Sequence, residues 1–108
     1  MTNEFQSWFL EQDEFVQLKI REVLERLKMH GPQLGRPDVD TLYGSDKVSN
    51  LKELRVNASS RPYRIFFTFN PNRDALVLCA GVKDGANEKK FYKKHIKLAE
   101  KLFEEYTR

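Results

Sequence analysis

The spacing of apolar residues in the first third of the chain predicts two consecutive helices. Apolar positions recur three or four residues apart, in a first set of Phe5, Trp8 and Phe9 and a second set of Phe15, Val16, Ile20, Val23, Leu24 and Leu27. Asp13 has a side chain typical of a helix N-cap, so the break between the helices is expected near residues 11–13. Gly31 and Pro32 are expected to end the second helix, because both residue types are typical of helix C-termini.

Residues 31–50 are expected to form a loop or a series of turns. The segment contains three of the five glycines and two of the four prolines, which interrupt regular structure. A loop of this length is unusual in a compact domain, and it indicates either a function or packing over a surface.

Three runs after residue 50 have the pattern of β-strands, at residues 51–56, 63–69 and 75–82. The last run is almost wholly apolar, which predicts a central strand buried on both faces. Residues 70–74 are rich in turn formers and are expected to form a hairpin turn. The three runs therefore predict an antiparallel meander.

A final helix is expected from about residue 87 to residue 106. Two adjacent apolar stripes follow its spacing, formed by Phe91, His95, Leu98, Leu102, Tyr92, Ile96, Ala99 and Phe103. The complete pattern predicts an α+β fold, in which N-terminal helices and a C-terminal helix pack on a small antiparallel sheet.

Length and composition fit one domain over residues 1–108, with a core that needs neither metal nor disulfide. Apolar residues make up 40% and charged residues 32%, as in soluble globular proteins. The longest apolar runs fall far short of the ~20 residues that span a membrane, and no signal peptide follows Met1. The lone Cys79 is expected to be an inert core thiol. We therefore expect a cytoplasmic protein with no membrane partner.

The positive charge is concentrated in two segments of the second half. The net charge of the chain is only +3, but residues 83–97 carry six lysines against two acidic residues, and residues 52–64 carry four basic residues against Glu53. Such clustering suits a polyanionic partner. A solvated, lysine-rich helix face explains the same pattern, and charge alone does not decide between the two.

Several short stretches, in the same order and spacing, make the chain resemble the RelE/ParE toxin superfamily, and within it the phage-derived HigB-like branch. The stretches are Gly35-Arg36-Pro37, Asp40-Thr41-Leu42, Leu51-Lys52-Glu53-Leu54-Arg55-Val56, Arg61-Pro62-Tyr63-Arg64-Ile65, Gly81-Val82-Lys83-Asp84-Gly85 and Phe91-Tyr92. The resemblance covers roughly residues 5–106 and implies the RelE-like microbial RNase fold. Family members usually begin with a β-strand, whereas no apolar alternation precedes Phe5 here, so that strand is either reduced to a stub or trimmed.

The resemblance implies the toxin of a bacterial toxin–antitoxin pair. It implies a ribosome-dependent endoribonuclease that cuts mRNA without metal or cofactor and thereby inhibits translation. The implied partners are mRNA on the ribosome and a cognate helix-turn-helix antitoxin of the HigA-like kind. The same scaffold also serves ParE-like proteins that inhibit DNA gyrase and cut nothing, and a non-catalytic RNA-binding remnant is a third alternative.

Four residues are the candidate catalytic groups: Arg55, Arg64, Lys83 and Tyr92. The two arginines match the family's strand arginines, and arginine's planar fork suits two phosphate oxygens. The alternative is a pair of surface arginines bound to Glu53 or Asp84. Lys83 ends the third predicted strand, where functional side chains are common. Tyr92 matches a family tyrosine that stacks on a base or positions the 2′-hydroxyl, and a core aromatic is the competing interpretation.

Side chains alternate between the two faces of a strand, so Arg64 points to the face opposite that of Tyr63 and Ile65. If Tyr63 and Ile65 face the core, Arg64 is expected on the exposed face of the sheet. Its removal is then expected to cost little stability. Candidate RNA-binding residues are Lys52, Arg61, Lys89, Lys90, Lys93 and Lys94. No metal-ligand spacing is present, since the two histidines, His30 and His95, lie far apart and His95 falls on an apolar stripe.

Overall fold

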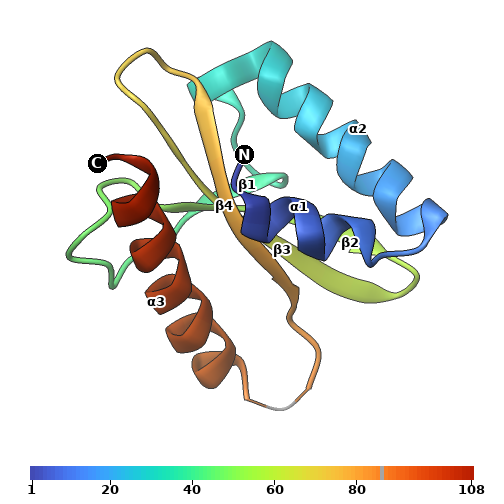
Figure 1. Cartoon of the computed structure of the whole chain (residues 1–108). Coiled ribbons are helices and arrows are strands. Elements are labelled where there is room, and N and C mark those ends of the chain that lie inside the picture. The colour runs from blue at the N-terminus through green and yellow to red at the C-terminus, as the bar shows by residue number, and fades with distance from the viewer. Residues whose placement is uncertain (86) are drawn as a thin grey trace.

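The computed structural model describes residues 1–85 and 87–108, and it shows a four-stranded antiparallel sheet with helices on both faces (Figure 1). The elements in chain order are α1 (Asn3–Leu10), α2 (Glu14–His30), the 3-10 helix η1 (Gly31–Gln33), β1 (Val39–Thr41), β2 (Lys52–Ala58), β3 (Arg61–Phe69), β4 (Ala75–Val82) and α3 (Glu88–Tyr106). Helices α1 and α2 cover one face, and α3 covers the other. The expected α+β fold is confirmed.

Side-chain caps fix where the helices begin. The Asp13 carboxylate accepts a hydrogen bond from the Val16 amide at 2.9 Å, as an N-cap should, and Asn87 caps α3 through the Lys90 amide. Gly31 ends α2 with a φ of 58°, a conformation that favours glycine. The helix boundaries expected from sequence are therefore confirmed.

No helix in the described part of the chain is both long and apolar enough to cross a membrane.

The sheet order is β1-β2-β3-β4, with every neighbouring pair antiparallel. The expected meander is thus confirmed, but the central position expected for residues 75–82 is wrong. Strand β4 lies at the edge, and it is largely buried because α1 packs on one of its faces and α3 on the other. The backbone amide of Thr2 donates to the Val77 carbonyl at 3.1 Å. The hydroxyl of Thr2 also donates to the Leu78 carbonyl, so these two contacts tie the residue before α1 to β4.

A short strand, β1, lies inside the segment that was expected to be a loop. It pairs with β2 in the register Val39↔Leu54, Asp40↔Glu53 and Thr41↔Lys52. Val39 is buried, and its side chain joins the core beneath α2. The sequence expectation is wrong here because three residues are too few to show alternation. The strand brings Asp40 beside the middle of the sheet.

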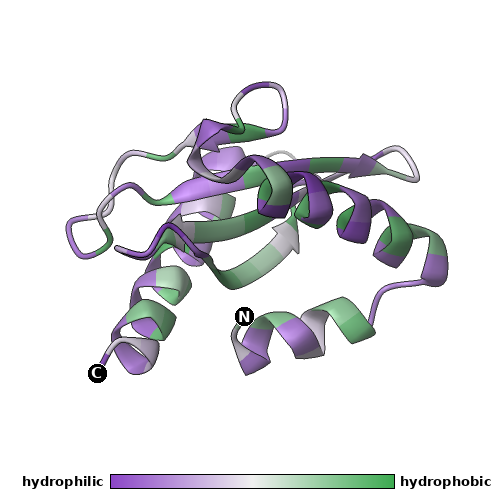
Figure 2. Ribbon diagram, turned by 90° about the horizontal axis from the view of Figure 1, so that it is seen from above, coloured by the Kyte–Doolittle hydropathy of each residue, from purple (hydrophilic) through white to green (hydrophobic). Residues whose placement is uncertain are grey.

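Two hydrophobic cores sandwich the sheet. The core under α1 and α2 contains Phe5, Ile20, Leu54, Ile65 and Phe67, and the core under α3 contains Phe66, Leu78, Cys79, Ala99 and Leu102. Figure 2 shows the corresponding green, apolar sides of the helices and of the central strands. No broad face of the sheet is therefore exposed in the described structure, so the expectation that Arg64 points to an open face is wrong.

The thiol of Cys79 lies in the core under α3, as expected for an inert cysteine. Burial, assisted by the charge of Glu4, raises its pKa to about 12. At neutral pH the group is therefore a protonated thiol and a poor nucleophile.

His95 predicts how stability depends on pH. Burial, with the nearby charge of Lys94, lowers its pKa from the usual 6.5, against the opposing hydrogen bond with the Phe91 carbonyl. The unfolded chain then binds more protons than the folded chain below about pH 6.5, so the free energy of unfolding should fall as the pH drops through this value. Urea denaturation at pH 7.5 and 5.5 measures this change.

The matched variants separate the two histidines. His95→Gln should flatten the decrease in stability between the two pH values, whereas His30→Gln, at the exposed end of α2, should leave it unchanged. An identical decrease in all three proteins would assign it to other groups.

Candidate functional site

Three of the four predicted catalytic side chains meet around one buried carboxylate, that of Glu53. The Tyr92 hydroxyl donates to Glu53 Oε1 at 2.6 Å, and Arg55 Nε donates to Glu53 Oε2 at 3.0 Å. Arg64 Nε lies 3.8 Å from Oε1. Only 1% of Glu53 is exposed. Because a buried carboxylate needs charged or hydrogen-bonding partners, Glu53 fixes the positions of the groups around it.

Strand register and helix placement together explain this meeting. Strands β2 and β3 pair Arg55 with Arg64 and Glu53 with Phe66, so all four side chains point to the same face of the sheet. Helix α3 covers that face and brings Tyr92 against the ring of Phe66. The site is therefore built by three elements that are distant in sequence.

Arg64 is buried rather than exposed, with 8% of its surface accessible. Its Nη1 donates to the Tyr63 carbonyl at 3.0 Å, and its buried Nε has no hydrogen-bond partner among the described residues. The expectation that its removal would cost little stability rested on an exposed side chain, and that premise is wrong. We instead expect a loss of stability, because the Glu53 carboxylate would lose a neighbouring cation. The position still suits a guanidinium that lies beneath Glu53 and holds its carboxylate in place.

Lys83 completes the group from the end of β4. Its ammonium donates to Glu88 at 2.9 Å and lies 5.7 Å from the centre of the Tyr92 ring. Burial, followed by the bond to Glu53, raises the pKa of Tyr92 to about 12. Tyr92 is therefore a neutral hydroxyl at physiological pH, which can donate a hydrogen bond but is not a free phenolate base.

The predicted RNA-binding residues are more dispersed. Lys52 is half-buried and donates to the Thr41 hydroxyl at 3.0 Å, while Arg61 forms an ion pair with Asp84 at 2.7 Å. The remaining four are exposed on the first two turns of α3: Lys89, Lys90, Lys93 and Lys94. The structure thus places these lysines on one helix that also carries Tyr92.

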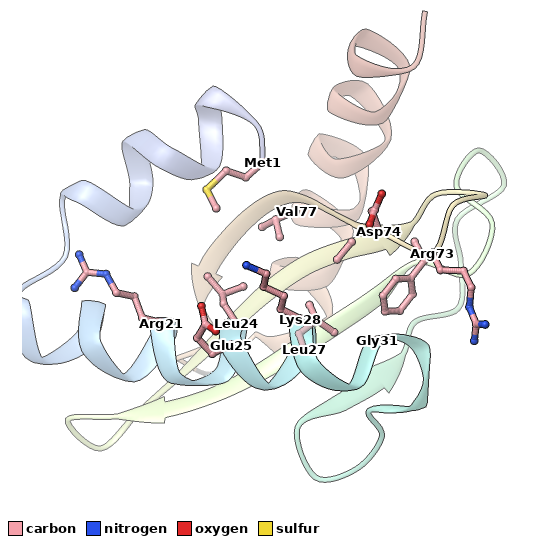
Figure 3. A pocket seen from close by; sticks show the side chains of 12 residues that line it. Met1, Arg21, Leu24, Glu25, Leu27, Lys28, Gly31, Arg73, Asp74 and Val77 are labelled. Atoms are coloured by element: carbon pink, nitrogen blue, oxygen red, sulfur yellow. The ribbon is translucent and has the colours of Figure 1, made fainter.

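Two of the hollows on the surface differ in character. One of about 440 Å³ reaches Arg55 and Arg64, and its other charged lining residues are Lys19, Arg26, Glu22 and Asp38, so its net charge is +2. The other, of about 530 Å³, is apolar and lies between α2 and the start of β4, near Met1 (Figure 3). None of the predicted site residues lines the apolar groove. The chemistry of the lining residues therefore favours the polar hollow as the site.

The described residues contain no group of three or more metal-ligating side chains. His95 is half-buried and stacks on Phe66 of the core, with ring centres 5.5 Å apart, as its place on an apolar stripe predicted. Sequence reasoning missed Glu53 as a member of the site. The available signal was an acidic residue inside an otherwise apolar and basic strand pattern.

Comparison with known proteins gives a consistent result. Residues 7–104 match the family of phage-derived Gp49-like proteins. Two relatives from Mycobacterium tuberculosis, HigB2 and HigB3, are named as candidate toxins; they are 43% identical over 84 residues and 36% identical over 99 residues, respectively. The chain spans 41% of the length of HigB2 and 83% of that of HigB3. These alignments cover 77% and 92% of the chain. No solved structure matches it.

Proposed function

Because the chain belongs to the family of phage-derived Gp49-like proteins, we propose that it is the toxin of a bacterial toxin–antitoxin pair and acts as a ribosome-dependent mRNA endoribonuclease. The observation that carries the proposal is the pair of Arg55 and Tyr92 on buried Glu53, with Lys83 beside the Tyr92 ring and a positively charged hollow next to Arg55. RNA cleavage without metal needs a cationic site for the phosphate together with groups that move protons.

The proposed reaction is attack by a 2′-hydroxyl on the adjacent phosphorus. The 2′-oxygen forms a bond to phosphorus and the bond to the 5′-oxygen breaks, giving a 2′,3′-cyclic phosphate and a 5′-hydroxyl. Tyr92 takes the proton of the 2′-hydroxyl as its own proton passes to Glu53, a transfer that their 2.6 Å hydrogen bond allows. Arg55 stabilises the charge that develops on the phosphate, and the Lys83 ammonium protonates the leaving 5′-oxygen.

The partners follow from the same proposal. A cytoplasmic HigA-like antitoxin with a helix-turn-helix DNA-binding domain would neutralise the chain, and mRNA on the ribosome would be the substrate. A ParE-like inhibitor of DNA gyrase is the second candidate function. The cationic site favours RNA cleavage over gyrase inhibition, because an inhibitor that cuts nothing needs no phosphate site of this kind.

Mapping mRNA ends after induction tests the proposal directly. New 5′ ends should appear within translated reading frames, and they should vanish when translation initiation of the same message is blocked. Growth arrest without new ends, accompanied by loss of DNA supercoiling, would instead support the gyrase alternative. Co-expression of the neighbouring reading frame should restore growth if its product is the antitoxin.

The lysines of α3 predict a salt dependence. Reversing the charges of Lys90, Lys93 and Lys94 to glutamate should flatten the decrease in ribosome affinity with rising salt, since each lost contact with single-stranded RNA lowers the slope by about 0.7. Binding to purified ribosomes over a salt series measures the slope. A matched reversal of Arg21, Lys28 and Arg73, which line the apolar groove on the other face, should leave the slope unchanged. An unchanged slope in the α3 variant would identify its lysines as a solubilising surface.

A further inference from the structure

The segment just before β1 carries an arginine that reaches the site. Arg36 Nη2 donates to Asp40 Oδ2 at 3.0 Å, and Arg55 Nη2 donates to the same oxygen at 3.1 Å. One carboxylate oxygen therefore bridges two guanidinium groups from different parts of the chain. Asp40 pairs with Glu53 across β1 and β2, and β1 is the edge strand. The bridge therefore lies next to the cluster around Glu53, on the side of the sheet edge.

Exposure divides the three arginines near the site into two kinds. The side chain of Arg36 is 75% exposed and that of Arg55 is 35% exposed, whereas that of Arg64 is 9% exposed. An RNA phosphate arriving from solvent can therefore contact Arg36 and Arg55 without rearrangement of the core. Arg64 is held beneath them against the Tyr63 carbonyl.

We propose that Arg36 and Arg55 form the phosphate clamp of this protein, and that the Asp40 carboxylate occupies the phosphate position until RNA displaces it. This inference rests on the proposed function and names the residues that receive the RNA backbone. A phosphate oxygen resembles a carboxylate oxygen in charge and in accepting two guanidinium hydrogen bonds. The bridged oxygen of Asp40 therefore marks where such an oxygen would bind.

The bridge is weak enough to be exchanged. The Arg36–Asp40 ion pair joins residues four positions apart at the surface, and such pairs contribute little to stability because water screens them. The pKa of Asp40 is nevertheless lowered: desolvation opposes the shift, but hydrogen bonds from Arg36 and the Thr41 amide, with the charges of both arginines, outweigh it. Asp40 is therefore an anion at neutral pH and competes with RNA for the same donors.

Two substitutions with opposite expected effects test the clamp. In a purified translation reaction, the toxin concentration that gives half-maximal cleavage of a reporter mRNA should fall several-fold for Asp40→Asn, because the competing charge is removed. The same concentration should rise for Arg36→Ala, because one phosphate donor is lost. A folding defect lowers activity only, so it cannot produce the gain expected of Asp40→Asn.

The chain supplies matched controls in a second exposed ion pair with the same spacing, Glu104 and Arg108 at the end of α3. Glu104→Gln and Arg108→Ala change the net charge equally and should leave the cleavage curve unchanged. If the wild-type chain cuts mRNA but Asp40→Asn and Arg36→Ala match it, the clamp is wrong and the proposed function stands. If the wild-type chain does not cut translated mRNA, the proposed function fails and the clamp fails with it.

Discussion

Arg55→Lys is expected to leave the chain folded and to reduce mRNA cleavage by roughly 10²–10³, equivalent to about 3–4 kcal/mol of transition-state stabilisation. Lysine keeps a positive charge beside Glu53, so the buried carboxylate retains a counter-ion. It lacks the planar fork that contacts Glu53 through Nε and Asp40 through Nη2 at the same time. Single-turnover cleavage in a translation reaction, with a thermal melt of the same preparation, measures both properties.

The control for this substitution is Arg21→Lys, an equally conservative change in an exposed arginine of α2 that belongs to the apolar groove. It should cleave at the wild-type rate. Full activity in Arg55→Lys would show that a point charge is sufficient at position 55, and the requirement for a guanidinium that contacts Glu53 and the phosphate position at the same time would be abandoned.

Glu53→Ala is expected to produce the largest loss of stability, about 3–5 kcal/mol, because removing one partner of a buried ion pair leaves the other charge uncompensated. Arg64, which is largely buried, would lose its nearest carboxylate, and the Tyr92 hydroxyl would lose its acceptor. Urea denaturation measures the free energy of unfolding. Glu104→Ala, an exposed carboxylate of α3, should change that free energy by no more than about 0.5 kcal/mol.

Glu53→Gln separates stability from chemistry. The amide keeps the shape and can still accept a hydrogen bond, so much of the stability should return. It does not take a proton from Tyr92, so cleavage should remain low. A Glu53→Gln protein that cleaves normally would contradict the proton transfer proposed between Tyr92 and Glu53, whatever its stability.

Much of the fold could be predicted from the sequence because its long elements satisfy local rules. The apolar spacing of α2 and α3 continues over several turns, and each helix has a capping side chain at its start. The hairpin between β3 and β4 has a turn-forming sequence in which the Asn70 side chain accepts from the Asp74 amide. These features depend on neighbouring residues, so the sequence displays them directly.

The expectations that failed depend on contacts between distant residues. Strand β1 is defined only by its pairing with β2, and β4 lies at an edge although its apolar sequence resembles that of a central strand. Arg64 is buried because α3 covers a face that alternation alone left open. Sequence patterning indicates which side chains share a face, but it does not show whether another element covers that face.

The candidate site shows the same division. Family resemblance pointed to Arg55 and Tyr92, the end of a predicted strand pointed to Lys83, and the fold brings the three close together. Glu53 and Asp40 were missed as site members because their significance lies in partners up to 39 residues away in the sequence, as in the bond between Tyr92 and Glu53. Whether these residues act on RNA stays a prediction.

The contact between β4 and α3 has a genetic consequence at codon 81. A Cβ atom on Gly81 would lie 2.5 Å from His95 Nε2, and the imidazole cannot easily move because it packs against Phe91 and is hydrogen-bonded to its carbonyl. Gly81 also pairs with Arg64 across the strands. Third-base changes leave glycine in place, and every other amino acid that a single base change can produce from a glycine codon carries a Cβ. Among survivors selected after induction of the wild-type gene, missense changes at this codon should therefore recur at both the first and the second base.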